Sequence, residues 1–513
     1  MSRIHPILFW WLLLLLGVGP VLADPALQLT ALAEVDSPQG GASPGPGTEG
    51  PAVSDPLDRA VALQLRQVLN GVDPPRAAGR RLDSSESLAR FYATRSYRPG
   101  WLESSKPAGK HPGPQAAALL EMLNEADSEG LGREDYHYQA LVETLSALEA
   151  TPGDVTRLAE LELLLSDAFL SYGKHLLQGR SRQDIGEGPH ALVPRQQDLA
   201  VTLEAALSGG DVALTLAGLR PPYPQYQRLR GALAQYRQLA AAGNWPLVPG
   251  GDRLEEGVTD PRVGALRARL RASGELAAGT LPVAGEDYFD RDLAGAVRAF
   301  QSRHGLAVDG VVGPNTLTAL NVSPAQRVRQ IELNLERWRW MPEDLGQRHI
   351  LVNVPAFELT VYEQDRPVLS MPVVVGRFQR QTPLFTARMS YLVMSPYWHI
   401  PRTIAIEDKL PVLRRNPHAL YRQGIRIYDA RSGRSVDPGA VDWSSVSGPS
   451  FYRNYRLRQN PGSNNALGRI KFMFPNPWNV YLHDTPQDYL FSRAHRAYSS
   501  GCVRVARPYD LAE

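Results

Sequence analysis

The chain of 513 residues contains a single cysteine, Cys502, so no intramolecular disulfide can stabilise any part of its fold. Its stability must therefore come from apolar cores, and the hydrophobic fraction of 43% and the charged fraction of 21% are ordinary for a globular protein. At ~150 residues per domain, the length corresponds to about three domains. The lone thiol is either a buried apolar side chain or a nucleophile, and the residues around it must decide between the two.

The first 23 residues have the pattern of a secretory signal peptide. A positively charged start precedes an apolar stretch over 7–18, and small residues lead to a cleavage site after Ala23. An uncleaved membrane anchor is the alternative, but the stretch is shorter than a ~20-residue span and Pro20 interrupts it. We therefore expect export, with membrane contact only through the signal peptide. An unpaired thiol is unusual in an exported chain because oxidation and disulfide exchange threaten it.

The next two segments differ in composition. Residues 24–56 are rich in Pro, Gly and Ser, which predicts a flexible linker. From residue 57 to residue 250, apolar residues recur at three- and four-residue spacing, which predicts a helical scaffold domain. We interpret an aromatic cluster within it as core packing; its members are Phe91, Tyr92, Tyr97 and Trp101.

Residues 255–322 predict three short helices with strong turn signals between the second and the third. Apolar spacing places the first helix around Val263–Leu270 and the second around Leu293–Phe300. Asp309-Gly310 is a turn dipeptide, and Gly313-Pro314 puts a proline at the first position of the third helix. A generic helical hairpin is the alternative interpretation.

After a connecting helix in residues 323–347, the hydrophobic period changes from helical to strand-like. Short β-branched runs separated by turn residues predict a β-rich domain over 348–513. Between residues 403 and 460 this rhythm weakens, while Arg, Pro, Gly and Ser accumulate. We interpret 403–460 as an insertion, either a lid over an active site or a plain surface excursion. The predicted fold class is therefore α+β multidomain.

Two short motifs carry the reactive residues of this domain, Tyr481-Leu482-His483 and Ser499-Ser500-Gly501-Cys502-Val503-Arg504. A thiol attacks a carbonyl as thiolate, and a nearby histidine can accept its proton. Strand alternation places Tyr481 and His483 on one face, and Arg504 shares the face of Cys502 if that segment is a strand. Gly501 permits a tight turn that exposes N–H groups to a developing oxyanion. Arg504 stabilises a thiolate, holds a substrate carboxylate or forms a structural salt bridge, and the residues leave these roles open.

Composition excludes several other classes of function. The net charge of +2 gives no reason to expect a nucleic acid partner. The chain has no CxxC, no HExxH and no phosphate-loop pattern, so neither a metal nor a cofactor is predicted.

The order of the reactive residues and their surroundings resemble the catalytic domain of L,D-transpeptidases. Papain-type peptidases and the smaller cell-wall Cys/His peptidases place cysteine before histidine, whereas here His483 precedes Cys502. The chain is particularly similar to the large periplasmic members, which combine a helical scaffold, a peptidoglycan-binding domain and a lid-bearing catalytic domain. The segment 255–322 resembles the three-helix peptidoglycan-binding domain. The residues that carry these resemblances are Ala296–Gln301, Asp309-Gly310, Gly313–Thr316, Asn334–Trp340, Thr382-Pro383, Tyr397-Trp398, His483–Pro486, Leu490-Phe491, Arg496-Ala497 and Ser499–Arg504.

The resemblance implies a periplasmic enzyme with a β-rich, mixed-sheet, sandwich-like catalytic domain and a defined reaction. Cys502 would attack the third residue of a tetrapeptide stem, release D-alanine and pass the thioester to a diaminopimelate amine, giving a 3→3 cross-link. His483 would be the general base and acid. The oxyanion site would consist of the Gly501 and Cys502 N–H groups with the Tyr481 hydroxyl. The resemblance also implies that Ser500 and Arg504 belong to the catalytic centre. It implies that the substrate-binding residues are Tyr397, Trp398 and Ser499.

The resemblance also implies acylation by carbapenems and leaves cell-wall synthases as possible partners. Many relatives carry a histidine where Ser500 stands, although the large members do not, and those usually continue well beyond the position of Glu513. A fragment or a truncated reading frame is therefore one expectation. Two alternative functions stay open, a non-catalytic wall-binding scaffold and an L,D-carboxypeptidase or hydrolase that uses the same site with water as the acceptor.

Overall fold

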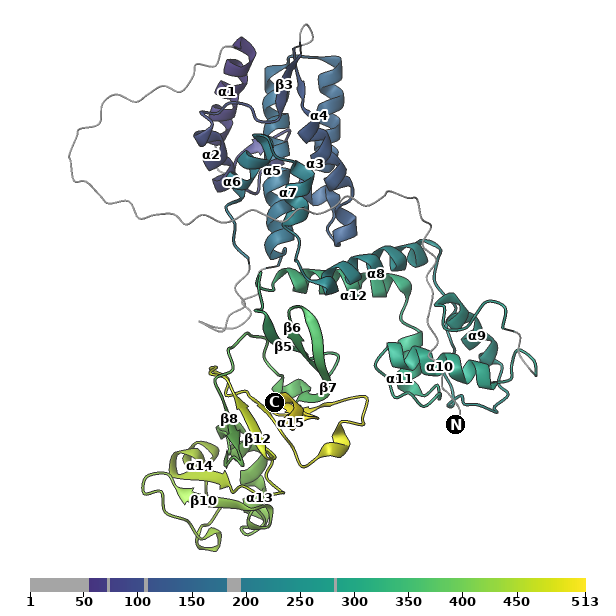
Figure 1. Cartoon of the computed structure of the whole chain (residues 1–513), viewed down its shortest axis with the longest axis vertical. Helices are drawn as coiled ribbons and strands as arrows, with labels where there is room; N and C mark the ends of the chain where they lie inside the picture. Colours follow the sequence, from purple (N-terminus) through teal and green to yellow (C-terminus); the bar gives the residue numbers. More distant parts are fainter. Residues whose placement is uncertain (1–54, 72–73, 106–108, 182–194, 281–283) are drawn as a thin grey trace, which may run out of the picture. The chain divides into compact units, whose positions relative to one another are not determined.

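The computed structural model describes residues 55–71, 74–105, 109–181, 195–280 and 284–513 (Figure 1). The predicted signal peptide over 1–23 and nearly all of the predicted linker over 24–56 lie outside these residues. Among the described residues, no helix has both the length and the apolar character needed to cross a bilayer. Helical segments precede a β-rich segment, which confirms the predicted α+β multidomain class.

The first part of the described chain is mainly helical, as predicted. Two small hairpins that the sequence did not reveal, β1–β2 and β3–β4, lie between the helices. The elements are α1 (Pro56–Leu69), β1 (Arg76–Ala77), β2 (Arg80–Arg81), α2 (Ser85–Thr94), β3 (Leu102–Ser105), β4 (Gly109–Pro112), α3 (Pro114–Asn124), η1 (Ala126–Glu129), η2 (Arg133–Tyr136), α4 (Tyr138–Ala150), α5 (Val155–Gln178), α6 (Leu199–Leu207), α7 (Val212–Gly218) and α8 (Pro224–Ala241).

Helix α5 is the centre of this region, because it is buried around nearly its whole circumference rather than along one stripe. Its Glu162 carboxylate accepts the backbone N–H of Trp101 at 2.7 Å, and the Trp101 indole donates to Ser166 Oγ at 2.9 Å. These bonds satisfy polar groups that burial would otherwise leave without partners. Phe91 and Tyr92 are buried beside them, so the aromatic cluster is core packing, as predicted.

Three helices follow α8, namely α9 (Arg262–Ala272), α10 (Arg291–Arg303) and α11 (Pro314–Leu320). They have their own apolar core, which includes Phe289 and Phe300. Pro314 is the first residue of α11, where its missing N–H costs no hydrogen bond. The three helices predicted within 255–322 are therefore confirmed.

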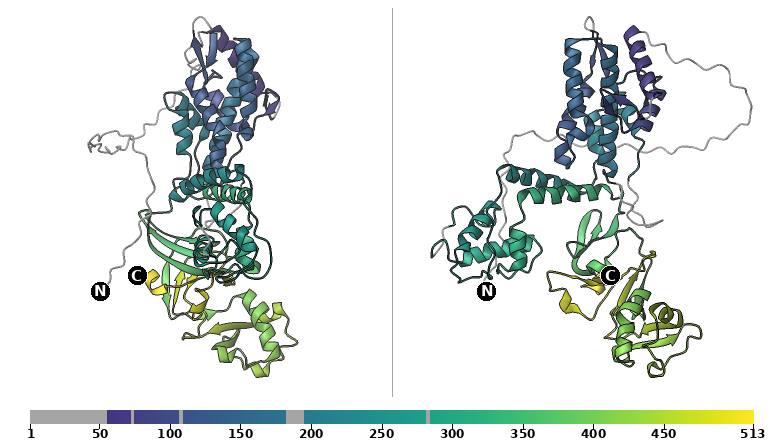
Figure 2. Two further views of the ribbon diagram at one scale, coloured as in Figure 1. Left: turned by 90° about the vertical axis from the view of Figure 1, so that its right-hand side faces the viewer. Right: turned by 180° about the vertical axis from the view of Figure 1, so that it is seen from behind.

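Helix α12 (Pro324–Arg339) then pairs with α8, and the two lie side by side in all views (Figure 1 and Figure 2). A capping box formed by Ser323 and Gln326 starts α12. The predicted connecting helix over 323–347 is thus shorter than expected, since it ends at Arg339 and Pro342 follows.

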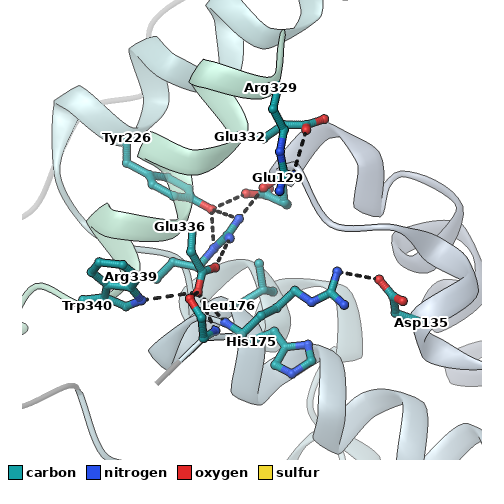
Figure 3. A network of polar contacts seen from close by, with 12 residues as sticks. Glu129, Asp135, His175, Leu176, Tyr226, Arg329, Glu332, Glu336, Arg339 and Trp340 are labelled. Atoms are coloured by element: carbon teal, nitrogen blue, oxygen red, sulfur yellow. Dashed lines mark hydrogen bonds and ion pairs between the residues drawn. The ribbon is translucent and has the colours of Figure 1, made fainter. Parts of the chain in front are cut away.

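A buried network of ionic groups joins α12 and α8 to the helical region (Figure 3). The Glu129 side chain is fully buried and accepts hydrogen bonds from Tyr226 (2.7 Å) and Arg220 (2.7 Å), while Arg230 Nε lies 2.8 Å from the same carboxylate. Arg339 of α12 donates to the backbone carbonyl of Glu129 and to the Tyr226 hydroxyl. One fully buried carboxylate therefore compensates several guanidinium groups, of which Arg220 and Arg230 are partly exposed.

A second carboxylate at this junction accepts hydrogen bonds from the backbone N–H groups that follow α5. Glu336 accepts the backbone N–H groups of Arg180 (2.7 Å) and Ser181 (2.8 Å), and it also pairs with Arg339 at 3.1 Å (Figure 3). The indole of Trp340 donates to the same carboxylate at 3.3 Å. The Asn334–Trp340 motif therefore holds α12 against the helical region in this structure.

The β-rich region contains a mixed sheet of eight strands. Seven follow the order β5-β6-β7-β15-β13-β12-β8, and β14 pairs with β7 off this path. The pairs β13–β15 and β14–β7 are parallel, and the others are antiparallel. The elements are β5 (Arg348–Asn353), β6 (Glu358–Glu363), β7 (Arg366–Gly376), η4 (Phe378–Arg380), β8 (Tyr391–Met394), β12 (Ile470–Met473), β13 (Leu482–His483), η8 (Asp488–Leu490), β14 (Ala497–Ser499), β15 (Val503–Val505) and α15 (Pro508–Ala512).

The insertion predicted over 403–460 folds around a core of its own, which includes Leu413, Trp443 and Phe451. The expected loss of strand character is wrong in part, because β10 and β11 form a hairpin and β9 completes a sheet of order β10-β11-β9. The arginines that suggested a loop alternate with buried aliphatic residues along these strands. The elements are β9 (Trp398–His399), η5 (Ile404–Lys409), α13 (Leu410–Arg415), η6 (Tyr421–Gln423), β10 (Ile425–Asp429), η7 (Pro438–Ala440), α14 (Gly448–Asn454) and β11 (Tyr455–Gln459).

Candidate active site

Cys502 lies in the tight connection between β14 and β15. Gly501 has a φ of +117°, a conformation that residues with a side chain rarely adopt. The Ser499 hydroxyl donates to the carbonyl of Cys502 at 2.6 Å and accepts the N–H of Gly501 at 3.1 Å. The loop is thus held by its own side chains. The Gly501 N–H is engaged within the loop in this conformation, so its predicted role in an oxyanion site remains a prediction.

Tyr481 and His483 come from the neighbouring strand segment, and their rings face each other at 5.6 Å between centroids. Strand β13 is parallel to β15, and this register sets His483 opposite Arg504. The Tyr481 N–H and hydroxyl both form hydrogen bonds with the Cys502 thiol, which favour the thiolate and partly offset the rise in its pKa that burial causes. The structure therefore brings together four of the predicted residues: Tyr481, His483, Cys502 and Arg504.

The His483 imidazole is buried, and its Nδ1 lies 2.5 Å from the carbonyl of Asp484. Burial lowers the pKa of His483 to about 3, and the charges of Arg504 and Lys471 act in the same direction. The imidazole is consequently neutral at neutral pH and able to accept a proton. In the described part of the chain, no hydrogen bond joins the thiol to this ring. The resting arrangement is a neutral thiol near a neutral imidazole.

Lys471 is a site residue that the sequence analysis missed. The register of β12 places it opposite His483, so Lys471, His483 and Arg504 form a row across three strands. Its Nζ lies 3.8 Å from the centre of the Tyr481 ring. Burial raises the pKa of the Cys502 thiol, whereas Lys471 and Arg504 oppose that rise by attracting the thiolate. The alternation of Lys471 with the buried Ile470 and Phe472 was a signal for its direction.

These charges predict how the alkylation rate of Cys502 depends on pH. Burial raises the pKa of the thiol. The rate of alkylation by iodoacetamide should therefore keep increasing with pH at pH values above about 8.5, the ordinary pKa of a thiol. Replacing Lys471 with Met removes an attracting charge, so the midpoint should move to higher pH, whereas Lys471→Arg should leave it nearly in place. Intact-mass alkylation rates across the pH range measure both. A plateau at neutral pH in the unmodified chain would contradict this electrostatic description.

Ser500 is linked to the insertion by Arg380 of η4. The guanidinium donates to Ser500 Oγ at 3.0 Å, to both oxygens of Asp408 at 2.7 and 2.8 Å, and to Glu407 at 2.6 Å. Thr382 donates to the carbonyl of Gly501 at 2.8 Å, which fastens the same segment to the nucleophile loop. The start of the insertion is therefore tied to the residue two positions before Cys502.

The predicted substrate residues Trp398 and Tyr397 have different surroundings. The Trp398 side chain forms a hydrogen bond with the Tyr481 hydroxyl, so β9 reaches the catalytic residues. Tyr397 is half exposed, and the Arg458 guanidinium stacks on its ring at 4.6 Å. Ser499 is buried and holds the loop by the bonds described above. The roles of these three residues toward substrate remain predictions.

Arg504 is held by Gln487, whose amide oxygen accepts a hydrogen bond from it at 2.5 Å. Its Nε is buried and has no hydrogen-bond partner among the described residues. The structural salt bridge considered from sequence is not among the ion pairs of the described residues. No cluster of three or more His, Cys, Asp or Glu side chains suited to a metal ion occurs in the described ranges.

Three family models match separate parts of the chain. They are described as "Scaffold domain" over residues 86–233, "Putative peptidoglycan binding domain" over 259–320 and "L,D-transpeptidase catalytic domain" over 347–513. The chain is also 36% identical over 184 residues to a protein of Haemophilus influenzae named "Putative L,D-transpeptidase". That alignment covers 36% of each protein, so the similarity spans about a third of the relative's length.

Proposed function

Because the chain carries an L,D-transpeptidase catalytic domain beside a peptidoglycan-binding domain and a scaffold domain, we propose that it forms 3→3 cross-links between peptidoglycan stems. The observation that supports this most directly is the grouping of Cys502 with Tyr481, His483, Lys471 and Arg504 on adjoining strands. A thiol beside a neutral base and two cations is suited to acyl transfer.

The proposed first step forms a thioester. His483 accepts the thiol proton as Cys502 Sγ attacks the carbonyl of the third stem residue. Lys471 and Arg504 stabilise the thiolate, and the Tyr481 hydroxyl donates to the oxyanion of the tetrahedral intermediate. The protonated imidazole then gives its proton to the leaving amine, and D-alanine departs. The buried histidine is a strong donor once protonated, because its environment disfavours the charge.

The proposed second step regenerates the enzyme. A diaminopimelate side-chain amine of a neighbouring stem attacks the thioester and loses a proton to His483, and the thiol leaves with that proton. Since the acyl-enzyme keeps the energy of the first peptide bond, this exchange needs no nucleotide. The donor and acceptor stems are thus the proposed substrates, and cell-wall synthases are proposed partners that would supply new strands.

The same site supports a second outcome, hydrolysis by an L,D-carboxypeptidase reaction. The two outcomes differ only in whether water or an amine reaches the thioester. Incubation of the full chain with disaccharide-tetrapeptide, followed by chromatography and mass spectrometry of the products, separates them. A 3→3 dimer supports the transpeptidase, and free tripeptide alone supports the hydrolase. If neither product forms, the chain acts as a wall-binding scaffold without catalysis.

We also propose the compartment and the inhibitor class for this chain. Peptidoglycan lies outside the cytoplasm, and the signal-peptide pattern at the N-terminus supports export to the periplasm. A cysteine that forms a thioester with a stem should also be acylated by carbapenems. Fractionation of cells expressing the chain, and the mass of the chain after incubation with a carbapenem, test these two proposals separately.

A further inference from the structure

The insertion carries an unusual excess of positive charge. Residues 403–460 contain ten Lys and Arg and five Asp and Glu, a net charge of +5, whereas the whole chain carries +2. Part of that charge is concentrated on one face of the sheet β10-β11-β9. Buried residues occupy the other face, including Ile425, Ile427 and Leu457.

We define the arginine face as the outward side of this sheet. Arg426 lies directly opposite Arg458, and Arg458 lies directly opposite His399, so these three form one row across the strands. Tyr428 and Arg456 form the adjacent pair. Like charges directly opposite one another destabilise a sheet, and this hairpin nevertheless places two arginines there. Such an arrangement is favourable when an anion bridges the guanidinium groups.

Three arginines point outward from this sheet, namely Arg426, Arg456 and Arg458. Their guanidinium groups have no carboxylate among their described contacts. Arg458 donates to the Tyr428 hydroxyl at 2.6 Å and stacks between the Tyr397 and Tyr428 rings at 4.6 and 4.5 Å. Its Nε is buried and has no hydrogen-bond partner among the described residues. Arg426 and Arg456 contact backbone carbonyls and tyrosine rings. The stacking fixes planar groups that remain able to bind a carboxylate with two hydrogen bonds.

The nearby acidic groups are engaged elsewhere. Glu407 and Asp408 pair with Arg380, and Asp429 accepts hydrogen bonds from Ser432 and from the N–H of Arg431. No acidic residue stands on the outward positions of β10 or β11. The arginine face is therefore positive without internal neutralisation.

Strand β9 connects the arginine face with the catalytic residues. Trp398, the neighbour of His399 in β9, lies on the opposite, core-facing side of this sheet and is hydrogen-bonded to Tyr481. His399 lies opposite Arg458 in the register; burial lowers its pKa, and the charges of Arg458 and of Lys471, the residue opposite His483, act in the same direction. Positive groups thus extend from Lys471 beside Cys502 to Arg458 and Arg426.

We propose that the arginine face binds the free carboxylates of the stem peptide and holds the stem along the insertion while Cys502 reacts. This inference rests on the proposed function, which supplies a peptide with several carboxylates as the substrate. Arg458 is the central group, since it stands between Arg426 and His399 in the row. Amidation of the stem carboxylates would therefore reduce affinity for this chain.

Binding to the full chain carrying Cys502→Ala tests this without turnover. Titration calorimetry would compare two forms of a disaccharide-tetrapeptide. In the first all carboxylates are free, and in the second every carboxylate except the C-terminal one is amidated. We expect Arg458→Gln to weaken binding of the free-carboxylate stem by roughly tenfold, the loss of one charge-assisted hydrogen bond. Binding of the amidated stem should change little. Arg458→Lys should restore part of the affinity.

Arg434→Gln is the matched control, because it removes the same charge from an exposed residue of the insertion that is outside the arginine face. It should leave both affinities within about twofold of the parent. Equal affinity of the Arg458→Gln variant and its parent for the free-carboxylate stem would overturn the proposal. So would equal binding of free and amidated stems by the parent, or displacement of the stem by inorganic polyphosphate with no preference for the peptide.

Two modified stems distinguish the donor from the acceptor. A tetrapeptide whose diaminopimelate amine is acetylated serves only as a donor, and a tripeptide, which lacks the terminal D-alanine, serves only as an acceptor. The stem whose affinity falls in Arg458→Gln is the one that lies on the arginine face. Because these are binding measurements, they test the arginine face even if product analysis shows that the chain does not catalyse transpeptidation.

Discussion

Replacing His483 with Gln should reduce kcat/KM for a tetrapeptide stem by about 10²–10⁴, the contribution of a positioned general base and acid. Glutamine is close to histidine in size, and its amide can still donate to the carbonyl of Asp484, which His483 Nδ1 contacts at 2.5 Å. It cannot accept the thiol proton or return it to the leaving amine. The rate of D-alanine release measures the effect.

The matched control is His495→Gln, which changes an exposed histidine in the segment between the two motifs. This variant should retain the parent rate, and both variants should unfold at the parent's temperature. A structural role for His483 would instead lower the unfolding midpoint together with the rate. Activity within about threefold of the parent for His483→Gln would contradict the assignment of general base, since base catalysis contributes at least 10².

The largest expected effect on stability comes from Glu129→Gln. This substitution leaves a hydrogen-bond acceptor in place but removes the negative charge that compensates Arg220 and Arg230 and lies beside Arg339. Breaking a buried ion pair by removing one partner costs about 3–5 kcal/mol; since Arg220 and Arg230 are partly exposed and water compensates part of their charge, we expect the lower end, about 3 kcal/mol. The free energy of unfolding of the helical region should fall by about that amount, as measured by denaturant titration.

Glu332→Gln is the matched control for this effect. Its ion pair with Arg237, at 2.9 Å, is partly exposed, with side-chain exposures of 20% and 32%. Loss of such a pair should cost about 1 kcal/mol or less. An equal, small effect of the two substitutions would show that the Glu129 network does not hold α8 and α12 to the helical region.

Sequence patterns predicted most of the helical architecture, because it depends on local periodicity and capping. Proline at the start of α11 and the apolar spacing within α9 and α10 were sufficient for the three-helix segment. The hairpin β10–β11 was missed because the arginines at alternate positions suggested a loop. The Glu129 network was invisible, since its members are up to 210 residues apart in the chain.

In the candidate site, too, local motifs were predictable from the sequence and features that depend on the tertiary structure were not. Tyr481, His483 and Cys502 were chosen from two short motifs and from a family resemblance, and the structure places them together. Lys471 was missed because its proximity depends on the register between β12 and β13, which no local pattern specifies. The neutral state of His483 was also beyond the sequence, because it results from burial by residues distant in the chain.

The proposed reaction depends on a thioester at Cys502, and intact-protein mass spectrometry tests this intermediate most directly. The full chain and its Cys502→Ala variant are incubated with disaccharide-tetrapeptide and quenched in acid at short times. We predict a transient mass increase that equals the stem without its terminal D-alanine, located on Cys502 by peptide mapping, and no increase in the alanine variant. Product formation by the alanine variant, or the absence of any adduct from folded protein, would contradict the account.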